Sequence, residues 1–291
     1  MTNYLLCKTT TNNYKWVISI STIPVSIMAA LIATLGTWLV TALGAASVLF
    51  FKHPKEKLMD ILLGFAAGVM ISASFWSLLQ PAVRTAEEYL QISPAIVVTV
   101  GFTCGALFMW TSDKIVNCVQ RKFTADKTQN PNSTFKRIVM LVLSITLHNI
   151  PEGLAVGVAF GALSGHDATP DEWMGAISIA IGIGLQNFPE GAAVSLPLRR
   201  EGYSRRKSFF FGQASGIVEP ISGVIGALLV MHIQPFLPFA LSFAAGSMIL
   251  VAAHELIPEC QISTETKRSY CATMGIIVGF AGMMFLDVFL G

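Results

Sequence analysis

The chain has 291 residues, of which 53% are hydrophobic and only 12% are charged, and its formal net charge is +2. Ordinary soluble domains carry about 25% charged residues, so this composition excludes a typical soluble enzyme or binding domain. The apolar residues instead fall into long blocks between short polar segments, a pattern typical of proteins that cross a membrane many times.

Eight apolar blocks reach about 20 residues, the length that a helix needs to cross a bilayer. In chain order, the predicted spans are residues 24–51, 58–80, 94–114, 137–163, 173–198, 207–231, 235–257 and 270–290. We therefore predict an all-α membrane protein with eight transmembrane helices. Residues 1–23 are expected to form an extracytoplasmic or interfacial segment, and residues 24–291 the transmembrane domain, with a polar cytoplasmic loop at about 115–136.

The distribution of basic residues predicts the orientation of the chain. Sixteen of the 19 Lys and Arg residues lie in the loops after the first, third, fifth and seventh spans. Loops rich in Lys and Arg stay on the cytoplasmic side of a membrane. We therefore expect these four loops to be cytoplasmic and both chain termini to be extracytoplasmic.

Four apolar blocks carry polar residues at depths where a charged side chain costs about 2.5–3.5 kcal/mol. The fourth span reads SITLHNIPEGLAVGVAFG and the fifth reads IGIGLQNFPEGAAVSLPL, so both contain (His/Gln)-Asn-x-Pro-Glu-Gly, called the twin motif below. An unusual pattern on two successive helices favours one site built from two halves. With a glutamate of the sixth span, the candidate metal ligands are His148, Asn149, Glu152, Gln186, Asn187, Glu190 and Glu219.

The spacing within the motif has a direct chemical meaning. His148 and Glu152 are four residues apart and share one helix face, while Asn149 reaches the same carboxylate from a slightly rotated face. Pro151 and Pro189 should kink their helices beside these groups. A lone Asn could instead be an interhelical hydrogen-bond partner, and two Glu could be a protonated structural pair. The repetition of the whole pattern favours the metal site.

These motifs resemble the ZIP (Zrt/Irt-like) family of divalent metal transporters. HNIPEG at 148–153 and QNFPEG at 186–191 match the fourth-helix and fifth-helix motifs of that family, and the tracts at 64–82 and 186–199 look like its GufA-type branch. The resemblance implies inverted three-helix repeats that flank helices four and five, termini outside the cytoplasm, and a homodimer.

The resemblance also implies a binuclear metal site. One metal would bind His148, Glu152, Gln186 and Glu190; the other would bind Asn149, Asn187 and Glu219 and share Glu152 and Glu190. Many family members have His where this chain has Gln186, and some have Asp where it has Asn187. The second position therefore has one negative charge fewer and could be a weak or auxiliary site.

Six further residues are assigned to a transport pathway by the same resemblance. Met70 and Ser77 would line the outer side, and Asp287 near the outer end of span eight would attract cations. His254 and Glu255, together with Asp113, would form the cytoplasmic exit. For Met70 the alternative is ordinary packing, and for His254 and Glu255 it is an interfacial pair.

We predict a transporter, not an enzyme, that carries Zn²⁺ (or Cd²⁺, Fe²⁺ or Mn²⁺) into the cytosol, without a prosthetic group or a nucleic-acid partner. The plasma membrane is the expected location, with an organelle membrane as the alternative. Two other functions stay open. An intramembrane metallohydrolase could use Glu152 and His148, although no HExxH occurs, and a cation channel or proton exchanger could use the carboxylates as a relay.

Overall fold

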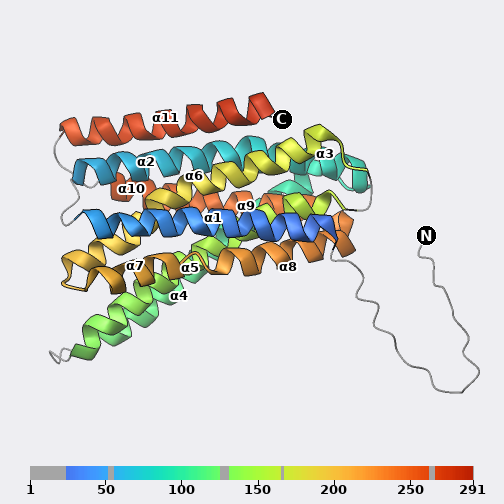
Figure 1. The fold of residues 1–291 in the computed structure, drawn as a ribbon. Helices are drawn as coiled ribbons and strands as arrows, with labels where there is room; N and C mark the ends of the chain where they lie inside the picture. The colour runs from blue at the N-terminus through green and yellow to red at the C-terminus, as the bar shows by residue number, and fades with distance from the viewer. Residues whose placement is uncertain (1–23, 52–55, 125–130, 165–166, 262–265, 291) are drawn as a thin grey trace, which may run out of the picture.

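The computed structural model describes residues 24–51, 56–124, 131–164, 167–261 and 266–290, and these residues form helices with no strand among them (Figure 1). This confirms the all-α prediction, while the predicted N-terminal segment 1–23 lies outside the described residues. In chain order the elements are α1 (Val25–Phe50), α2 (Glu56–Ala73), η1 (Ser74–Leu79), α3 (Gln80–Tyr89), α4 (Pro94–Thr124), α5 (Pro131–Ala162), α6 (Pro170–Arg200), α7 (Arg205–Ala214), α8 (Val218–His232), η2 (Gln234–Phe236), α9 (Leu237–Val251), η3 (Ala252–Leu256), α10 (Ile257–Cys260) and α11 (Thr266–Leu290). The elements η1 and η3 are π-helical turns that continue α2 and α9.

Much of the segment predicted as a polar cytoplasmic loop, at about residues 115–136, is helical in the described chain. Helix α4 runs on to Thr124 and α5 begins at Pro131, so the two helices extend well beyond their apolar parts. Lys, Arg and Gln are good helix formers, and a proline at the first helical position loses no hydrogen bond. Hydropathy locates the end of an apolar block, whereas the helix itself continues into polar sequence.

Six helical runs of the described chain are long and apolar enough to cross a membrane, and α5 and α6 are not among them. These two helices carry the twin motif, whose polar residues interrupt their apolar sequence. In the bundle they contact α1, α2, α4, α8 and α9 (Figure 1), and the polar residues of the motif are buried, whereas Phe188 of the motif is exposed. The chain is therefore an all-α, multi-pass membrane protein in which the polar residues of the twin motif are buried among the helices.

Two pairs of helices share one packing pattern. The segments at 65–70 and 243–248 read FAAGVM and FAAGSM, and in each a π-turn follows at the same distance. Their partner helices, α11 and α4, both contain Gly-x₃-Gly-x₇-Asp, at residues 275–287 and 101–113. The family resemblance implied inverted repeats, but these particular segments were not identified from the sequence.

The glycines of this repeat make equivalent contacts in the two pairs. A Cβ added at Gly279 of α11 would lie 2.1 Å from the carbonyl oxygen of Phe65 on α2. A Cβ added at Gly105 of α4 would lie 1.9 Å from the carbonyl oxygen of Phe243 on α9. Small residues allow helix backbones to touch in membranes, so α2–α11 and α4–α9 are two closely packed pairs of the same design.

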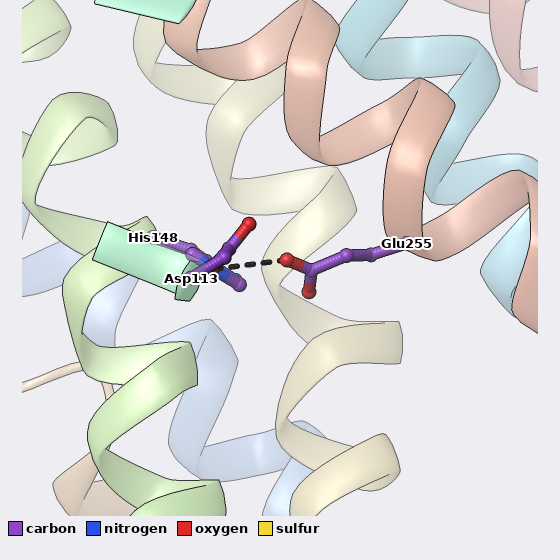
Figure 2. Close-up of side chains that lie close together, drawn as sticks. All are labelled: Asp113, His148 and Glu255. Atoms are coloured by element: carbon purple, nitrogen blue, oxygen red, sulfur yellow. Dashed lines mark hydrogen bonds and ion pairs between the residues drawn. The ribbon is translucent and has the colours of Figure 1, made fainter. Parts of the chain in front are cut away.

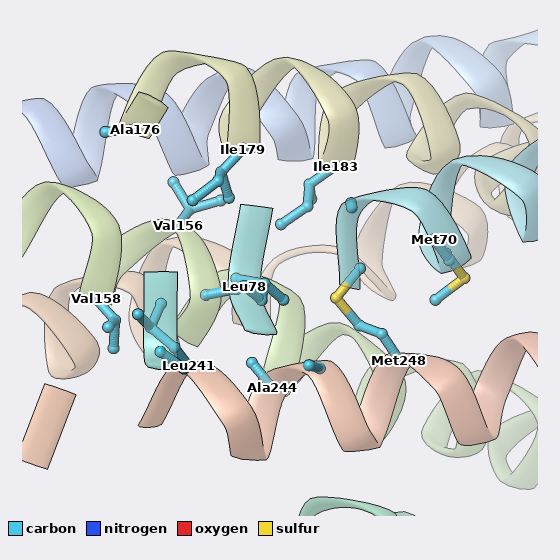
Figure 3. Close-up of a cluster of buried hydrophobic side chains, with 14 of the residues drawn as sticks. Met70, Leu78, Val156, Val158, Ala176, Ile179, Ile183, Leu241, Ala244 and Met248 are labelled. Atoms are coloured by element: carbon cyan, nitrogen blue, oxygen red, sulfur yellow. The ribbon is translucent and has the colours of Figure 1, made fainter. Parts of the chain in front are cut away.

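The largest apolar cluster joins α2, η1, α5, α6 and α9 (Figure 3). On α6 it includes Ile179 and Ile183, which precede the motif, and on α5 it includes Val156 and Val158, which follow the motif. Since α5 and α6 run in opposite directions (Figure 1), all four residues lie on the same side of the twin motif, toward the α5–α6 connection. Packed apolar side chains therefore fill the interior on that side.

Candidate metal centre

The structure places the twin motif in the interior of the bundle. All seven predicted ligands are buried, and Asn149, Gln186, Asn187 and Glu219 have no exposed surface. Neither Pro151 nor Pro189 ends its helix, because α5 and α6 continue through them. The motif thus presents its polar side chains from two continuous helices.

A direct hydrogen bond joins the two halves of the motif. The amide nitrogen Nε2 of Gln186 on α6 donates to Oε1 of Glu152 on α5 at 2.7 Å. This contact fixes the Gln186 side chain so that its own oxygen points elsewhere. The group that Gln186 leaves unpaired is therefore an amide oxygen.

Five buried acceptor oxygens of the motif have no hydrogen-bond partner among the described residues. An unpaired buried polar group costs about 1–3 kcal/mol, so a cluster of them calls for a chemical explanation. Carboxylate and amide oxygens are acceptors that bind hard or borderline cations, and a cation bound at the motif would give such oxygens a partner. The five atoms are Asn149 Oδ1, Glu152 Oε2, Gln186 Oε1, Asn187 Oδ1 and Glu190 Oε1.

Glu219 differs from these groups because both of its carboxylate oxygens have donors. The hydroxyls of Thr37 and Thr41 on α1 donate to Oε2 and Oε1 respectively, and Asn187 Nδ2 donates to Oε2 at 2.8 Å. The two threonines were not among the residues predicted from the sequence. Their only signal is a hydroxyl spacing of four residues inside an apolar span, which many membrane helices contain.

A second cluster joins His148 to two residues that were predicted on the exit route (Figure 2). The Nε2 atom of His148 lies 3.1 Å from Asp113 Oδ1 on α4 and 3.1 Å from Glu255 Oε1 on η3. Ligand atoms of the three residues all lie within 4.8 Å of one another. We call these residues the inner triad. Its geometry suits a metal ion, with one nitrogen and two carboxylate oxygens.

The inner triad changes the expected grouping of ligands. The resemblance placed His148 in one set with Glu152, Gln186 and Glu190, but its close contacts are Asp113 and Glu255. His148 and Glu152 still occupy one face of α5, four residues apart. His148 therefore belongs both to the twin motif, through its place on α5, and to the inner triad, through its contacts.

A cavity of about 810 Å³ adjoins the triad, and Val251 at the edge of the apolar cluster forms part of its lining. Its walls include His148, Glu190, Glu255 and His254, the last of which is exposed. It reaches the first residue of α2 and the last residue of α6, at the end of the bundle where α1 also ends (Figure 1). Its further charged lining residues are Glu56, Asp60, Arg200 and Glu259.

The outer pathway residues separate into two groups. Asp287 Oδ1 accepts hydrogen bonds from Ser77 Oγ at 2.6 Å and from Ser178 Oγ at 2.8 Å. Ser77 and Asp287 were predicted separately, and Ser178 was missed. Met70 lies in the apolar cluster and is only 1% exposed, so its visible role is packing.

The internal repeat relates the outer polar group to the inner triad. Ser77 occupies the same position after FAAGVM as Glu255 does after FAAGSM, and Asp287 ends the same glycine pattern as Asp113. Each end of the bundle therefore has an aspartate from one glycine-patterned helix beside a polar residue from a π-turn. A search for internal repeats would have paired these residues from the sequence alone.

Comparisons with known proteins identify the family of the chain. The family model described as ZIP zinc transporter matches residues 124–287. The chain is 38% identical to zinc transporter ZIP11 of Homo sapiens, with 91% of this chain and 98% of the relative aligned. It is 33% identical to zinc transporter GufA of Myxococcus xanthus over 90% and 99%, and 34% identical to zinc transporter ZIPB of Bordetella bronchiseptica over 86% and 78%. These matches confirm the resemblance, including the GufA-like branch, and assign the chain to transporters and not to an enzyme family. The chain belongs to the ZIP family of zinc transporters.

Proposed function

We propose that this chain carries Zn²⁺ from outside the cell, or from an organelle lumen, into the cytosol through a site on α5, α6 and α8. The five unpaired acceptor oxygens of the twin motif carry the proposal, because they lie buried on adjacent helices of a membrane protein. The named function of the relatives supports zinc as the transported ion.

The proposed route passes the polar groups in a fixed order. A cation would meet Asp287 and Ser77 first, then the twin motif, then the inner triad, and would leave through the cavity. His148 and Glu190 of the motif line the cavity. The cavity adjoins the helix ends next to the Lys- and Arg-rich loops, which supports an inward-facing arrangement.

The proposal includes the finer topology. All eight apolar blocks would cross the membrane, with both termini extracytoplasmic, and α5 and α6 would cross while shielded by their neighbours. The plasma membrane remains the expected location, with an organelle membrane as the alternative. A homodimer is proposed on the family resemblance.

The donor set narrows the choice of ion but does not fix it. One imidazole nitrogen with carboxylate and amide oxygens suits zinc, but iron, manganese and cadmium accept the same donors. Membership in a transporter family does not favour the two alternative functions, an intramembrane metallohydrolase and a cation channel or proton exchanger. Competition between ions, not ligand identity, will rank them.

The test is zinc uptake into proteoliposomes that contain the full-length chain. We expect saturable uptake, loss of uptake in Glu190→Gln, and little change in Glu87→Gln, a matched change at an exposed glutamate of α3. Cadmium, iron and manganese are then added as competitors. Flux that rises without saturation would indicate a channel, and zinc binding without uptake would contradict transport.

The inner triad gives a separate prediction about release. Asp113→Asn and Glu255→Gln each remove one negative group from beside His148, and each should lower maximal uptake about tenfold. Because both act through the same imidazole, the double variant should be less impaired than the product of the two effects. Glu259→Gln is the control, since Glu259 lines the same cavity without belonging to the triad. Independent, multiplicative effects would argue against a shared ion.

A further inference from the structure

Glu219 is a fully buried carboxylate that is surrounded by neutral donors. It lies at the start of α8. Its partners are Thr37 and Thr41 of α1 and Asn187 of α6. The Thr37 hydroxyl and Asn187 Nδ2 both contact Oε2, and the Thr41 hydroxyl contacts Oε1 at 3.3 Å, so this side chain is held from α1 and from α6. Glu219 is absent from the group of unpaired oxygens in the motif.

Close helix packing brings the threonines to this position. A Cβ added at Gly191 of α6 would lie 2.0 Å from the carbonyl oxygen of Thr41. A Cβ added at Gly216 would lie 3.0 Å from Glu219 Oε1. Glycine at both positions therefore lets α1 approach α6 and leaves room for the Glu219 carboxylate beside α1.

The orientation of the Asn187 amide follows from its neighbours. Its nitrogen Nδ2 donates to Glu219 Oε2 at 2.8 Å and contacts the carbonyl oxygen of Thr37 at 3.3 Å. Rotating the amide by half a turn would place Oδ1 against two other acceptors, which is unfavourable. The oxygen Oδ1 is therefore directed away from Glu219 and joins the unpaired oxygens of the motif.

Asn149 is oriented by the same principle. Its Nδ2 donates to the carbonyl oxygen of Ser215 at 3.0 Å, which leaves its Oδ1 unpaired. Ser215 lies in the break between α7 and α8, a few residues before Glu219. Acceptors between α7 and the start of α8 thus bind the amide nitrogens of both asparagines, and both amide oxygens stay unpaired in the motif.

We propose that Glu219 positions Asn187 and does not bind the transported metal, so that the central site of this chain holds one metal and not two. The inference rests on the proposed function and refines it. A metal shared by Glu219 and Asn187 would need the Asn187 oxygen to face the carboxylate, whereas the nitrogen faces it. An aspartate at position 187 would bring two carboxylates together, and a cation between them would then relieve the repulsion.

The first test measures the number of zinc ions bound per purified full-length chain by equilibrium dialysis. The number for each variant is compared with that for the wild type. Glu219→Gln should leave the count unchanged, because the removed carboxylate binds no metal. Asn187→Asp should add one zinc per chain, and the double variant Asn187→Asp/Glu219→Gln should return to the wild-type count. Glu152→Ala, which removes a proposed ligand, should lower the count.

The second test measures transport, because loss of a positioning group weakens metal affinity. Glu219→Ala should raise the apparent KM about tenfold. In Glu219→Gln the apparent KM should stay close to the wild-type value, since a carboxamide oxygen still accepts the hydrogen bond from Asn187. Thr37→Val should raise the KM, and the matched Thr37→Ser, which keeps the hydroxyl, should not. Monodisperse elution of each variant shows that it is folded.

A zinc count that falls by one in Glu219→Gln, with a KM as high as that of Glu219→Ala, would overturn the inference and leave the proposed function intact. Wild-type chain that binds no zinc at all would overturn both.

Discussion

Replacing Glu152 with alanine should reduce zinc uptake about 100-fold or more. Glu152 is fully buried on α5, bonds to Gln186 of α6 through one oxygen, and has its other oxygen unpaired. The substitution therefore removes a proposed ligand and the contact that joins the two halves of the motif. Uptake is measured in proteoliposomes at several zinc concentrations.

The controls for this prediction separate chemistry from folding. Glu152→Gln keeps the size and an acceptor oxygen for Gln186 but loses the charge, so it should fold like wild type and still lose most uptake. Glu87→Gln, at an exposed position, should behave as wild type. Full uptake in folded Glu152→Ala would exclude the twin motif as the route of the ion.

The largest effect on stability is expected for Gly157→Ala in α5. A Cβ at this position would lie 1.9 Å from the carbonyl oxygen of Gly223 on α8, a contact between backbones that no side-chain rotation relieves. Overpacking of this kind costs about 1–3 kcal/mol. The melting temperature of the purified protein should fall by about 5 °C, given the usual few degrees per kcal/mol.

Two other helical glycines provide matched controls for that measurement. Gly36 of α1 and Gly175 of α6 have nothing within 4 Å of an added Cβ. Alanine favours helix over glycine by about 0.8–1 kcal/mol, so Gly36→Ala and Gly175→Ala should leave the melting temperature unchanged or raise it slightly. Equal destabilisation in all three variants would show that helix packing is not the cause.

The burial of the twin motif could be predicted because charged groups are costly at bilayer depth, so Glu152 and Glu190 had to face the interior. The contacts that each of these polar side chains makes could not be predicted from the sequence. Whether His148 faces Glu152 or the pair Asp113 and Glu255 depends on how α4 and η3 pack against α5, and that packing leaves no mark on the spacing within α5.

Hydroxyl partners were harder to foresee than charged ones. Thr37 and Thr41 bind Glu219, and Ser178 binds Asp287, yet a threonine or serine in an apolar helix usually bonds to its own backbone and carries no distinctive signal. The helical ends of α4 and α5 were missed for a different reason. Hydropathy measures the apolar part of a helix, and these helices continue past it.

The π-turns η1 and η3 have a consequence for reading helix faces. An α-helix advances by about 100° per residue, and a π-turn inserts one residue more into that progression. Side chains before and after η1 or η3 are therefore out of phase by about that angle. A single helical wheel drawn through residues 56–89, or through residues 237–260, assigns the wrong face to one half of each helix. Scanning mutagenesis along either segment should thus be interpreted with a separate wheel on each side of the turn.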